Sequence, residues 1–148
     1  MIPRVVQVSF GHRTLLNFTS SQVTASDGFA VQNACRWVAA DFAKPVATRL
    51  LFSGVTMADT PANKTGSDKI LATIVELFDK LWNQRVTSTD AEVQRMYNLV
   101  VAVYNDRNNM PATPLACQLN TANDPTGMGR AWAIGLIYIV SDTKFLTF

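Results

Sequence analysis

The sequence predicts a mainly α-helical, single-domain protein of 148 residues, built as an antiparallel helical bundle with small β-hairpins at both termini. Two observations support this fold class. Through the middle of the chain, from Thr65 to Asn105, apolar residues recur every three or four positions, as they do on one face of a helix. Near both ends, the apolar residues alternate with polar ones or are strong β-formers.

The central segment indicates two amphipathic helices, residues 65–85 and 89–105, joined by the short turn at residues 86–88. Two apparent capping boxes, Thr65 with Asp68 and Thr89 with Glu92, mark the two starts, and Ser67 is a further candidate for the first. The apolar positions are Ile70, Leu71, Ile74, Val75, Leu77, Phe78, Leu81 and Trp82, then Val93, Met96, Tyr97, Val100, Val103 and Tyr104. Because the connection is so short, we expect a central αα-hairpin whose helices lie antiparallel and side by side.

The N-terminal part predicts a β-hairpin followed by a third helix of the bundle. Alternating apolar residues over 4–19 indicate the hairpin, and an N-terminal helix is expected over 28–43. That helix ends at Lys44-Pro45, because the residue before proline is disfavoured in the helical region. Residues 46–53 fit either a short strand or a fragment of helix.

The C-terminal part predicts a long loop, a short helix and a second hairpin. Residues 108–129 are rich in proline, glycine and asparagine, which is typical of a functional or mobile loop. A helix is expected over 130–134, after which Gly135 and the β-formers at 137–140 favour a hairpin. We expect the two terminal hairpins to pair in one small sheet and the last residue to be ordered.

Composition favours a subunit that associates with other protein surfaces. Apolar residues make up 48% of the chain and charged residues only 16%, against about 25% in typical soluble domains. Too few charges remain to cover a free surface, which predicts self-association over a small monomeric domain. The net charge of +2, from 13 basic and 11 acidic residues, is too balanced for a strongly basic DNA-binding module.

The two cysteines, Cys35 and Cys117, are far apart and do not match a zinc-binding pattern. We therefore expect two free thiols in a reducing compartment. The N-terminus lacks the apolar core of a signal peptide, and the longest apolar run, residues 131–140, is half the ~20 residues of a membrane span. The sequence thus predicts no association with a membrane.

Residues for catalysis are scarce. The chain has one histidine, His12 at a predicted turn, and two glutamates, Glu76 and Glu92, and no serine lies beside a histidine. It contains no phosphate-binding, dinucleotide-binding or metalloprotease motif. We expect a non-enzymatic protein with no catalytic residue, metal or cofactor.

Polar and basic residues gather around the turn between the two central helices. Helix N-terminal N–H groups at Asp90 and Ala91, together with arginine charges, form the kind of site that binds phosphates. Ordinary helix capping is the alternative explanation for the same residues. The candidate nucleic-acid-binding residues are Asn83, Arg85, Asp90 and Arg95 near the turn, with Arg36 and Arg49 as further candidates.

The layout of residues 18–109 resembles the coat proteins of rod-shaped plant viruses, the tobamovirus-like group. The resemblance is carried by FTSS before the first helix, VATRLLF after a proline break, a helix ending in LFDKLWNQRV, and the Thr-Ser-Thr-Asp opening of the next helix. It implies a four-helix bundle with a small sheet at one end, stacked helically around single-stranded RNA. It further implies that Arg85, and also Asp90 and Arg95, lie at the RNA. The predicted N-terminal hairpin and the apolar ending FLTF depart from that pattern.

These observations together predict a structural subunit that self-assembles in many copies, as a viral coat or nucleocapsid protein packaging single-stranded RNA. Its expected location is the virion and the host cytoplasm. Two alternatives remain open at this stage. One is a small helical scaffold or ligand-binding protein without nucleic acid, and the other is an enzyme with a site in the loop at residues 108–130.

Overall fold

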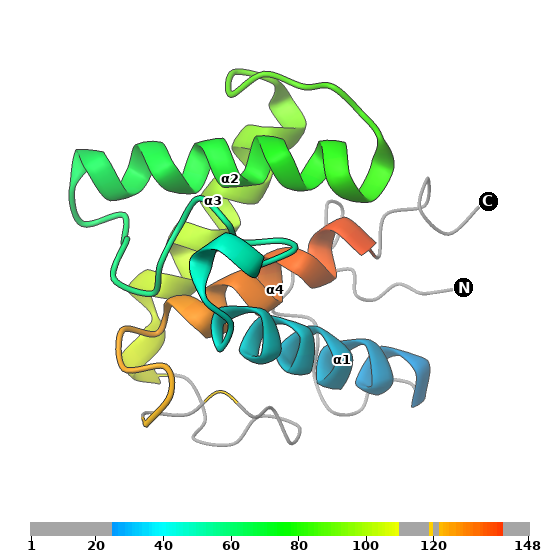
Figure 1. Cartoon of the computed structure of the whole chain (residues 1–148), viewed down its shortest axis with the longest axis vertical. Coiled ribbons are helices and arrows are strands. Elements are labelled where there is room, and N and C mark those ends of the chain that lie inside the picture. Colours follow the sequence, from blue (N-terminus) through cyan, green and yellow to red (C-terminus); the bar gives the residue numbers. More distant parts are fainter. Residues whose placement is uncertain (1–24, 110–118, 120–121, 141–148) are drawn as a thin grey trace.

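The computed structural model describes residues 25–109, 119 and 122–140, and individual side chains from Asn33 onward. This part of the chain is mainly helical, as predicted, and contains no strand (Figure 1). Its elements are α1 (Ala25–Phe42), η3 (Val46–Thr48), α2 (Lys64–Trp82), α3 (Ala91–Asn105), η4 (Arg107–Asn109) and α4 (Met128–Val140).

Helix α4 lies at the centre of the fold. It packs against both α1 and α3, and α2 packs on α3, so that the helices contact one another in the order α2, α3, α4, α1 (Figure 1). The buried residues of α4 are Met128, Gly129, Ala131, Trp132, Ala133, Gly135, Leu136, Ile137 and Ile139. A helix that is apolar on nearly every side must be covered on several sides, which explains this position.

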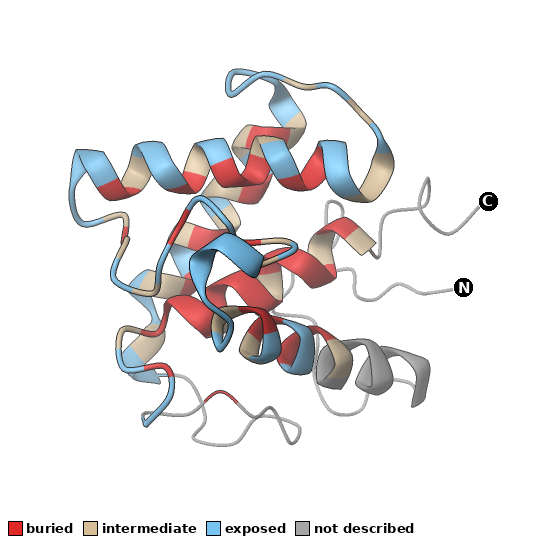
Figure 2. Ribbon diagram, viewed as in Figure 1, coloured by how far each residue is buried: buried red, intermediate tan, exposed pale blue. Residues whose placement is uncertain are grey.

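The outer helices bury one side only. Figure 2 shows α2 and α3 with alternating buried and exposed residues, whereas α4 is buried along most of its length. The largest fully buried side chains include Trp132, Phe52 and Phe78. Phe52 links the segment after α1 to the core. Its ring stacks on the Phe42 ring, and its ring centroid lies 5.2 Å from that of Trp132.

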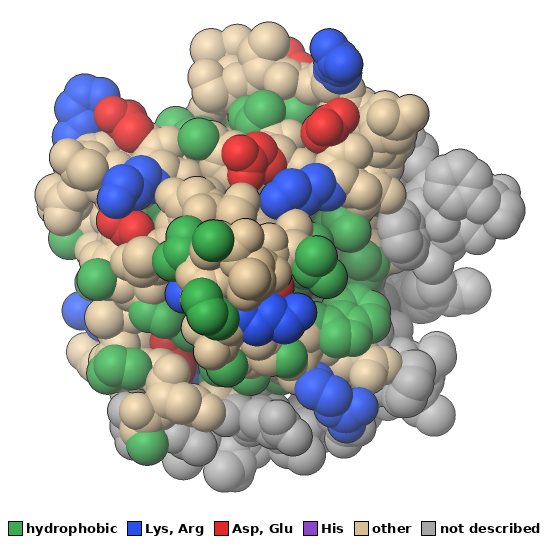
Figure 3. All heavy atoms as spheres, in the orientation of Figure 1, with side chains coloured by type: hydrophobic (Ala, Val, Ile, Leu, Met, Phe, Trp, Pro, Cys, Tyr) green, Lys and Arg blue, Asp and Glu red, His purple; other side chains and the backbone are tan. Residues whose placement is uncertain are grey.

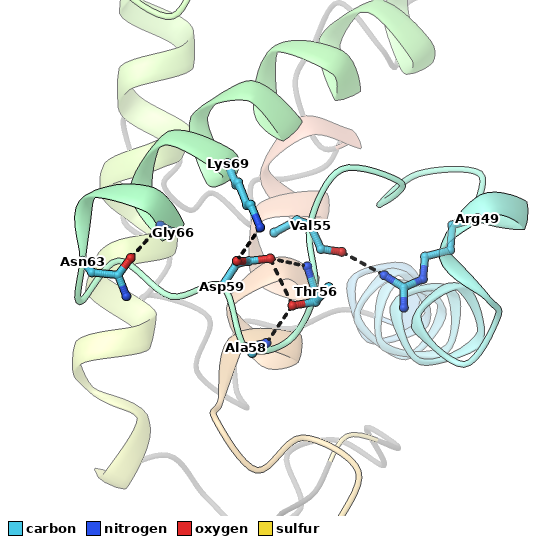
Figure 4. Close-up of polar contacts among 8 residues, drawn as sticks. All are labelled: Arg49, Val55, Thr56, Ala58, Asp59, Asn63, Gly66 and Lys69. Carbon is cyan, nitrogen blue, oxygen red and sulfur yellow. Dashed lines mark hydrogen bonds and ion pairs between the residues drawn. The ribbon is translucent and has the colours of Figure 1, made fainter.

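The connection between α2 and α3 is longer than predicted, and the side-by-side hairpin is not confirmed. Residues 83–90, here called the linker, are not helical, although the sequence suggested a turn at residues 86–88 only. Figures 1 and 4 show α2 lying across α3 rather than along it. An extended linker allows this change of direction, which a three-residue turn would not.

The predicted helix caps were wrong. The N-cap of α2 is Asn63, whose Oδ1 accepts the Gly66 N–H at 2.8 Å, instead of Thr65 or Ser67 (Figure 4). The N-cap of α3 is Asp90 instead of Thr89. Helix α1 begins at Ala25, three residues before the predicted start, and ends at Phe42, close to the predicted end.

The segment after α1 is an irregular loop held by side chains. Of the two structures proposed for residues 46–53, only the helix fragment is found, as the short turn η3. Asp59 then organises the approach to α2, since its carboxylate accepts the Thr56 N–H at 2.7 Å and the Lys69 Nζ at 3.1 Å (Figure 4).

The C-terminal prediction of a hairpin from Gly135 onward was wrong where it can be compared. Residues 137–140 are the last turn of α4, because burial outweighs the β-propensity of isoleucine, tyrosine and valine at these positions. The loop predicted at 108–129 begins with η4 and ends with turns at 122–127. The N-terminal hairpin, the rest of the C-terminal one and the sheet between them lie outside the described residues.

The expectation of two free thiols was also wrong, because Cys35 is disulfide-bonded. Cys117 lies outside the described residues. Neither spacing nor local pattern in the sequence indicated a disulfide at Cys35. The argument for a reducing compartment from cysteine usage therefore no longer holds. Among the described helices, none has the length and apolar character needed to cross a membrane.

Candidate functional site

The linker begins where Asn83 ends α2. Asn83 adopts a left-handed conformation, with φ 54°, which asparagine tolerates better than most residues. Its N–H donates to the Asp79 carbonyl at 2.8 Å, and the Gln84 N–H donates to the Phe78 carbonyl at 3.2 Å. Gln84 and Arg85 are therefore directed out of the helix that sequence periodicity assigned them to.

The far end of the linker is a turn closed by Asp90. The Asp90 carboxylate accepts the Thr87 N–H at 3.0 Å and the Thr87 hydroxyl at 3.2 Å, while the Asp90 N–H donates to the Thr87 carbonyl at 3.1 Å. Gln94 Nε2 donates to the Ser88 carbonyl at 2.6 Å and ties the turn to α3. Because Asp90 bonds to the linker, its side chain does not cap the N–H groups in the first turn of α3.

Arg85 lies in the exposed part of the linker. Within the described part of the chain, its guanidinium forms neither a hydrogen bond nor an ion pair. Of the predicted site residues, Asn83, Arg85 and Asp90 thus lie in one exposed segment, with Asn83 and Arg85 near its start and Asp90 at its end. This segment lies at one edge of the molecule, beyond the ends of α2 and α3 (Figure 1).

Arg95 lies one turn into α3 and is already paired. Its Nη2 is 3.2 Å from Glu92 Oε2, and Tyr138 Oη donates to Glu92 Oε1 at 3.2 Å, so the group joins the start of α3 to the end of α4. Contact with the Tyr138 hydroxyl, and then with Glu92, raises the pKa of Arg95. Burial, reinforced by Glu92, raises the pKa of Tyr138 to about 12.

The structure does not bring Arg36 or Arg49 to the linker. Arg36 is exposed on α1, with Nη1 at 3.5 Å from Asn33 Oδ1. Arg49 is occupied by its own chain. Its Nη1 donates to the Val55 carbonyl at 2.8 Å (Figure 4). Its Nε donates to the Lys44 carbonyl at 3.0 Å, and the guanidinium carbon lies 4.9 Å from the centre of the Phe42 ring. Arg49 therefore stabilises the loop and is left out of the proposed site.

Two buried carboxylates hold backbone groups that sequence reasoning did not assign to them. Asp41 accepts N–H groups from Leu50 at 2.8 Å and Phe52 at 2.9 Å. Asp124 accepts the N–H groups of Gly129 at 2.7 Å and Arg130 at 3.0 Å, at the start of α4. An aspartate just before an apolar run was the available signal for the second of these roles. Asp124 is thus engaged in holding the start of α4, in the loop where an enzyme site was considered.

Sequence reasoning also missed the most exposed apolar residues, Trp37, Val46 and Leu50. Nothing in the sequence placed these three side chains at the surface. Within the described part of the chain, no group of three His, Cys, Asp or Glu residues is arranged to hold a metal ion. Comparison of the chain with protein families, with curated proteins and with solved structures finds no match.

Proposed function

We propose that this protein is a structural subunit that self-assembles and packages single-stranded RNA, as a viral coat or nucleocapsid protein. The observation that carries the proposal is the exposed linker between α2 and α3, which holds Arg85, without a partner in the described chain, near its start and leads at its far end to a helix N-terminus without a side-chain cap. The resemblance to rod-shaped plant virus coat proteins supports the same assignment.

The linker offers the donors that a phosphate backbone requires. Arg85 supplies a charge, the open N–H groups of α3 supply a dipole and hydrogen bonds, and Asn83 supplies an exposed amide. These groups recognise phosphate and sugar, which positions RNA without reading its sequence. The Asp90 carboxylate lies nearby and repels phosphate, so the affinity of one subunit is expected to be low. Many copies bound along one strand would make up for this through avidity.

Self-assembly is supported by apolar side chains that the fold leaves exposed. Trp37, Val46 and Leu50 are 49%, 45% and 69% exposed, in a chain that is only 16% charged. Clustered exposed apolar residues are a feature of surfaces that bind other proteins.

The RNA-binding part is tested with Arg85→Ala against a fluorescent single-stranded oligouridylate, by anisotropy at several salt concentrations. Loss of one phosphate contact is expected to weaken binding about fivefold and to lower the slope of log K against log salt by about 0.7. Lys64→Ala is the matched control, because Lys64 is an exposed cation at the opposite end of α2. Equal slopes for wild type and Arg85→Ala would remove Arg85 from the site.

Measurements on the wild-type protein alone distinguish a coat protein from the alternative, a helical scaffold without nucleic acid. A coat protein is expected to bind the oligouridylate and to form particles visible by light scattering and electron microscopy. Wild type that binds no oligouridylate at low salt would exclude RNA packaging. Wild type that remains monomeric at every pH and salt concentration tested would exclude self-assembly.

A further inference from the structure

One face of the molecule combines exposed apolar and basic side chains. Its residues come from the outer side of α1 and the segment that follows, and we call them the basic-apolar face: Arg36, Trp37, Lys44, Val46 and Leu50. Figure 3 shows hydrophobic and basic side chains gathered over α1 and this segment, whereas the acidic side chains in the same view lie mainly over α2.

The exposure of this face is built into the fold. The Leu50 N–H donates to the Asp41 carboxylate at 2.8 Å, and Lys80 Nζ of α2 donates to the Leu50 carbonyl at 2.9 Å. Arg49 bonds the Lys44 carbonyl at 3.0 Å and closes the same segment onto the end of α1. The backbone is thus fastened on both sides of the exposed Leu50 side chain. A fixed apolar surface has little conformational entropy to lose on binding.

The charges on the basic-apolar face are of one sign. The only carboxylate among the described side chains of α1, Asp41, is buried and bonded to the backbone. Neither Arg36 nor Lys44 forms an ion pair with another described residue. Lys80, which contacts the Leu50 carbonyl, is itself paired with the exposed acid Glu76 at 3.9 Å.

Exposed carboxylates without an ion pair lie elsewhere. Among the described residues they are Asp79 near the end of α2, Asp90 at the start of α3, and Asp106 after α3. The unpaired cations Arg36 and Lys44 therefore have no exposed carboxylate among the described side chains of α1 or on the segment up to Leu50, whereas unpaired carboxylates are exposed on other elements of the same subunit. That separation is the arrangement expected where one copy complements the next.

We propose that the basic-apolar face binds a second copy of this chain in a heterologous contact, against a carboxylate-bearing surface of the neighbour. The inference rests on the proposed self-assembly and adds its interface and geometry. A two-fold contact of the face with itself would bring Arg36 and Lys44 of one copy against the same cations of the other. A heterologous contact avoids that repulsion and repeats from copy to copy, producing rings or open helical filaments. Trp37 and Leu50 supply most of the affinity, and the charges set the orientation.

The test uses the double variant Trp37→Ser with Leu50→Ser in the full chain, followed by sedimentation velocity and light scattering. We expect the variant to need about tenfold or more higher concentration than wild type to assemble. The matched control is Ala72→Ser with Ala102→Ser, which makes two exposed positions of α2 and α3 more polar and leaves the face intact. Circular dichroism of all three proteins establishes that helix content is unchanged.

Mixing experiments determine the type of contact. In a heterologous contact, the double variant still offers its carboxylate-bearing surface, so a small fraction added to wild type ends growing chains and reduces particle size. No effect of the variant on wild-type assembly would overturn the heterologous geometry. Assembly of the double variant at the same concentration as wild type would show that the basic-apolar face is not the interface between copies. A wild type that never assembles would instead overturn the proposed function on which the inference rests.

Discussion

Asp41 and Asp124 show how single residues hold this fold together. Both are buried, and both use their carboxylate oxygens to accept backbone N–H groups: residues 50–52 for Asp41, and Gly129 and Arg130 for Asp124. A buried backbone donor without an acceptor costs about 1–3 kcal/mol, and each aspartate avoids one such cost, at the Phe52 N–H and the Gly129 N–H respectively, besides bonding part-buried N–H groups. Residues of the type that perform acid–base chemistry elsewhere are here engaged in structure.

Tyr138 provides a pH-dependent prediction. Burial, with an added contribution from Glu92, raises its pKa from 10.0 to about 12. The neutral phenol is thus the form that the folded state favours. The stabilisation is complete below the unfolded pKa near 10 and is lost as the pH rises toward 12. Replacing Glu92 by glutamine is expected to lower the pKa of Tyr138 without returning it to 10, because burial is the larger cause.

Ultraviolet titration of tyrosinate absorbance measures this directly. Wild type is expected to show a late-titrating tyrosine that disappears in Tyr138→Phe and moves to lower pH in Glu92→Gln. Tyr104→Phe is the control and should leave the late step in place. A late step that survives in Tyr138→Phe would show that another tyrosine is responsible.

At the scale of elements, the start of α2 depends on a close approach that only glycine permits. A Cβ placed at Gly66 would overlap the backbone of Thr60, with the Thr60 nitrogen at 2.8 Å and its carbonyl oxygen closer still. A Cβ at Gly54 would meet only the Thr73 hydroxyl, at the ordinary distance of 3.7 Å. Gly54→Ala is therefore a suitable control for Gly66→Ala, because the same substitution meets no close contact there.

We expect Gly66→Ala to destabilise the protein by about 2 kcal/mol, although alanine is favoured over glycine inside a helix by about 1 kcal/mol. Gly54→Ala should change the free energy of unfolding by no more than about 0.5 kcal/mol. Urea unfolding followed by circular dichroism measures both. If Gly66→Ala were as stable as wild type, the contact with Thr60 would not restrain α2.

The sequence predicted helices well and their ends poorly, for physical reasons. Periodicity predicted α2 and α3, because apolar residues must share a face to be buried. Gln84 and Arg85 are good helix formers, so the predicted helix continued through them, although Asn83 is a residue type that can end a helix in a left-handed conformation. The polar linker was recognised as a candidate site from its residue types. Arg49 was not recognised as structural, because its acceptors are backbone carbonyls that only the folded loop brings together.

At the scale of the molecule, the sequence-based prediction failed most clearly at the C-terminal end of α4. Residues 137–140 have high β-propensity, and Gly135 suggested a break. In the fold, Gly135 lets α4 approach α3 closely, since a Cβ there would lie 2.9 Å from Met96 Cε and 3.1 Å from Val100 Cγ2. A residue that weakens an isolated helix thus favours this one in its tertiary setting.

The central position of α4 leads to a prediction about the dynamics of the whole chain. Because α4 packs between α1 and α3, its amide hydrogens can exchange only when much of the structure opens. Hydrogen exchange followed by mass spectrometry should show residues 128–140 protected at least about a hundredfold more than the linker at residues 83–90. Helix α2 is the internal control, since it packs on α3 at one side and should exchange at intermediate rates. Exchange of α4 as fast as the linker would contradict the central role of α4. The expected order of exchange rates, slowest in α4 and fastest in the linker, would describe a rigid core that carries a mobile polar linker at its edge.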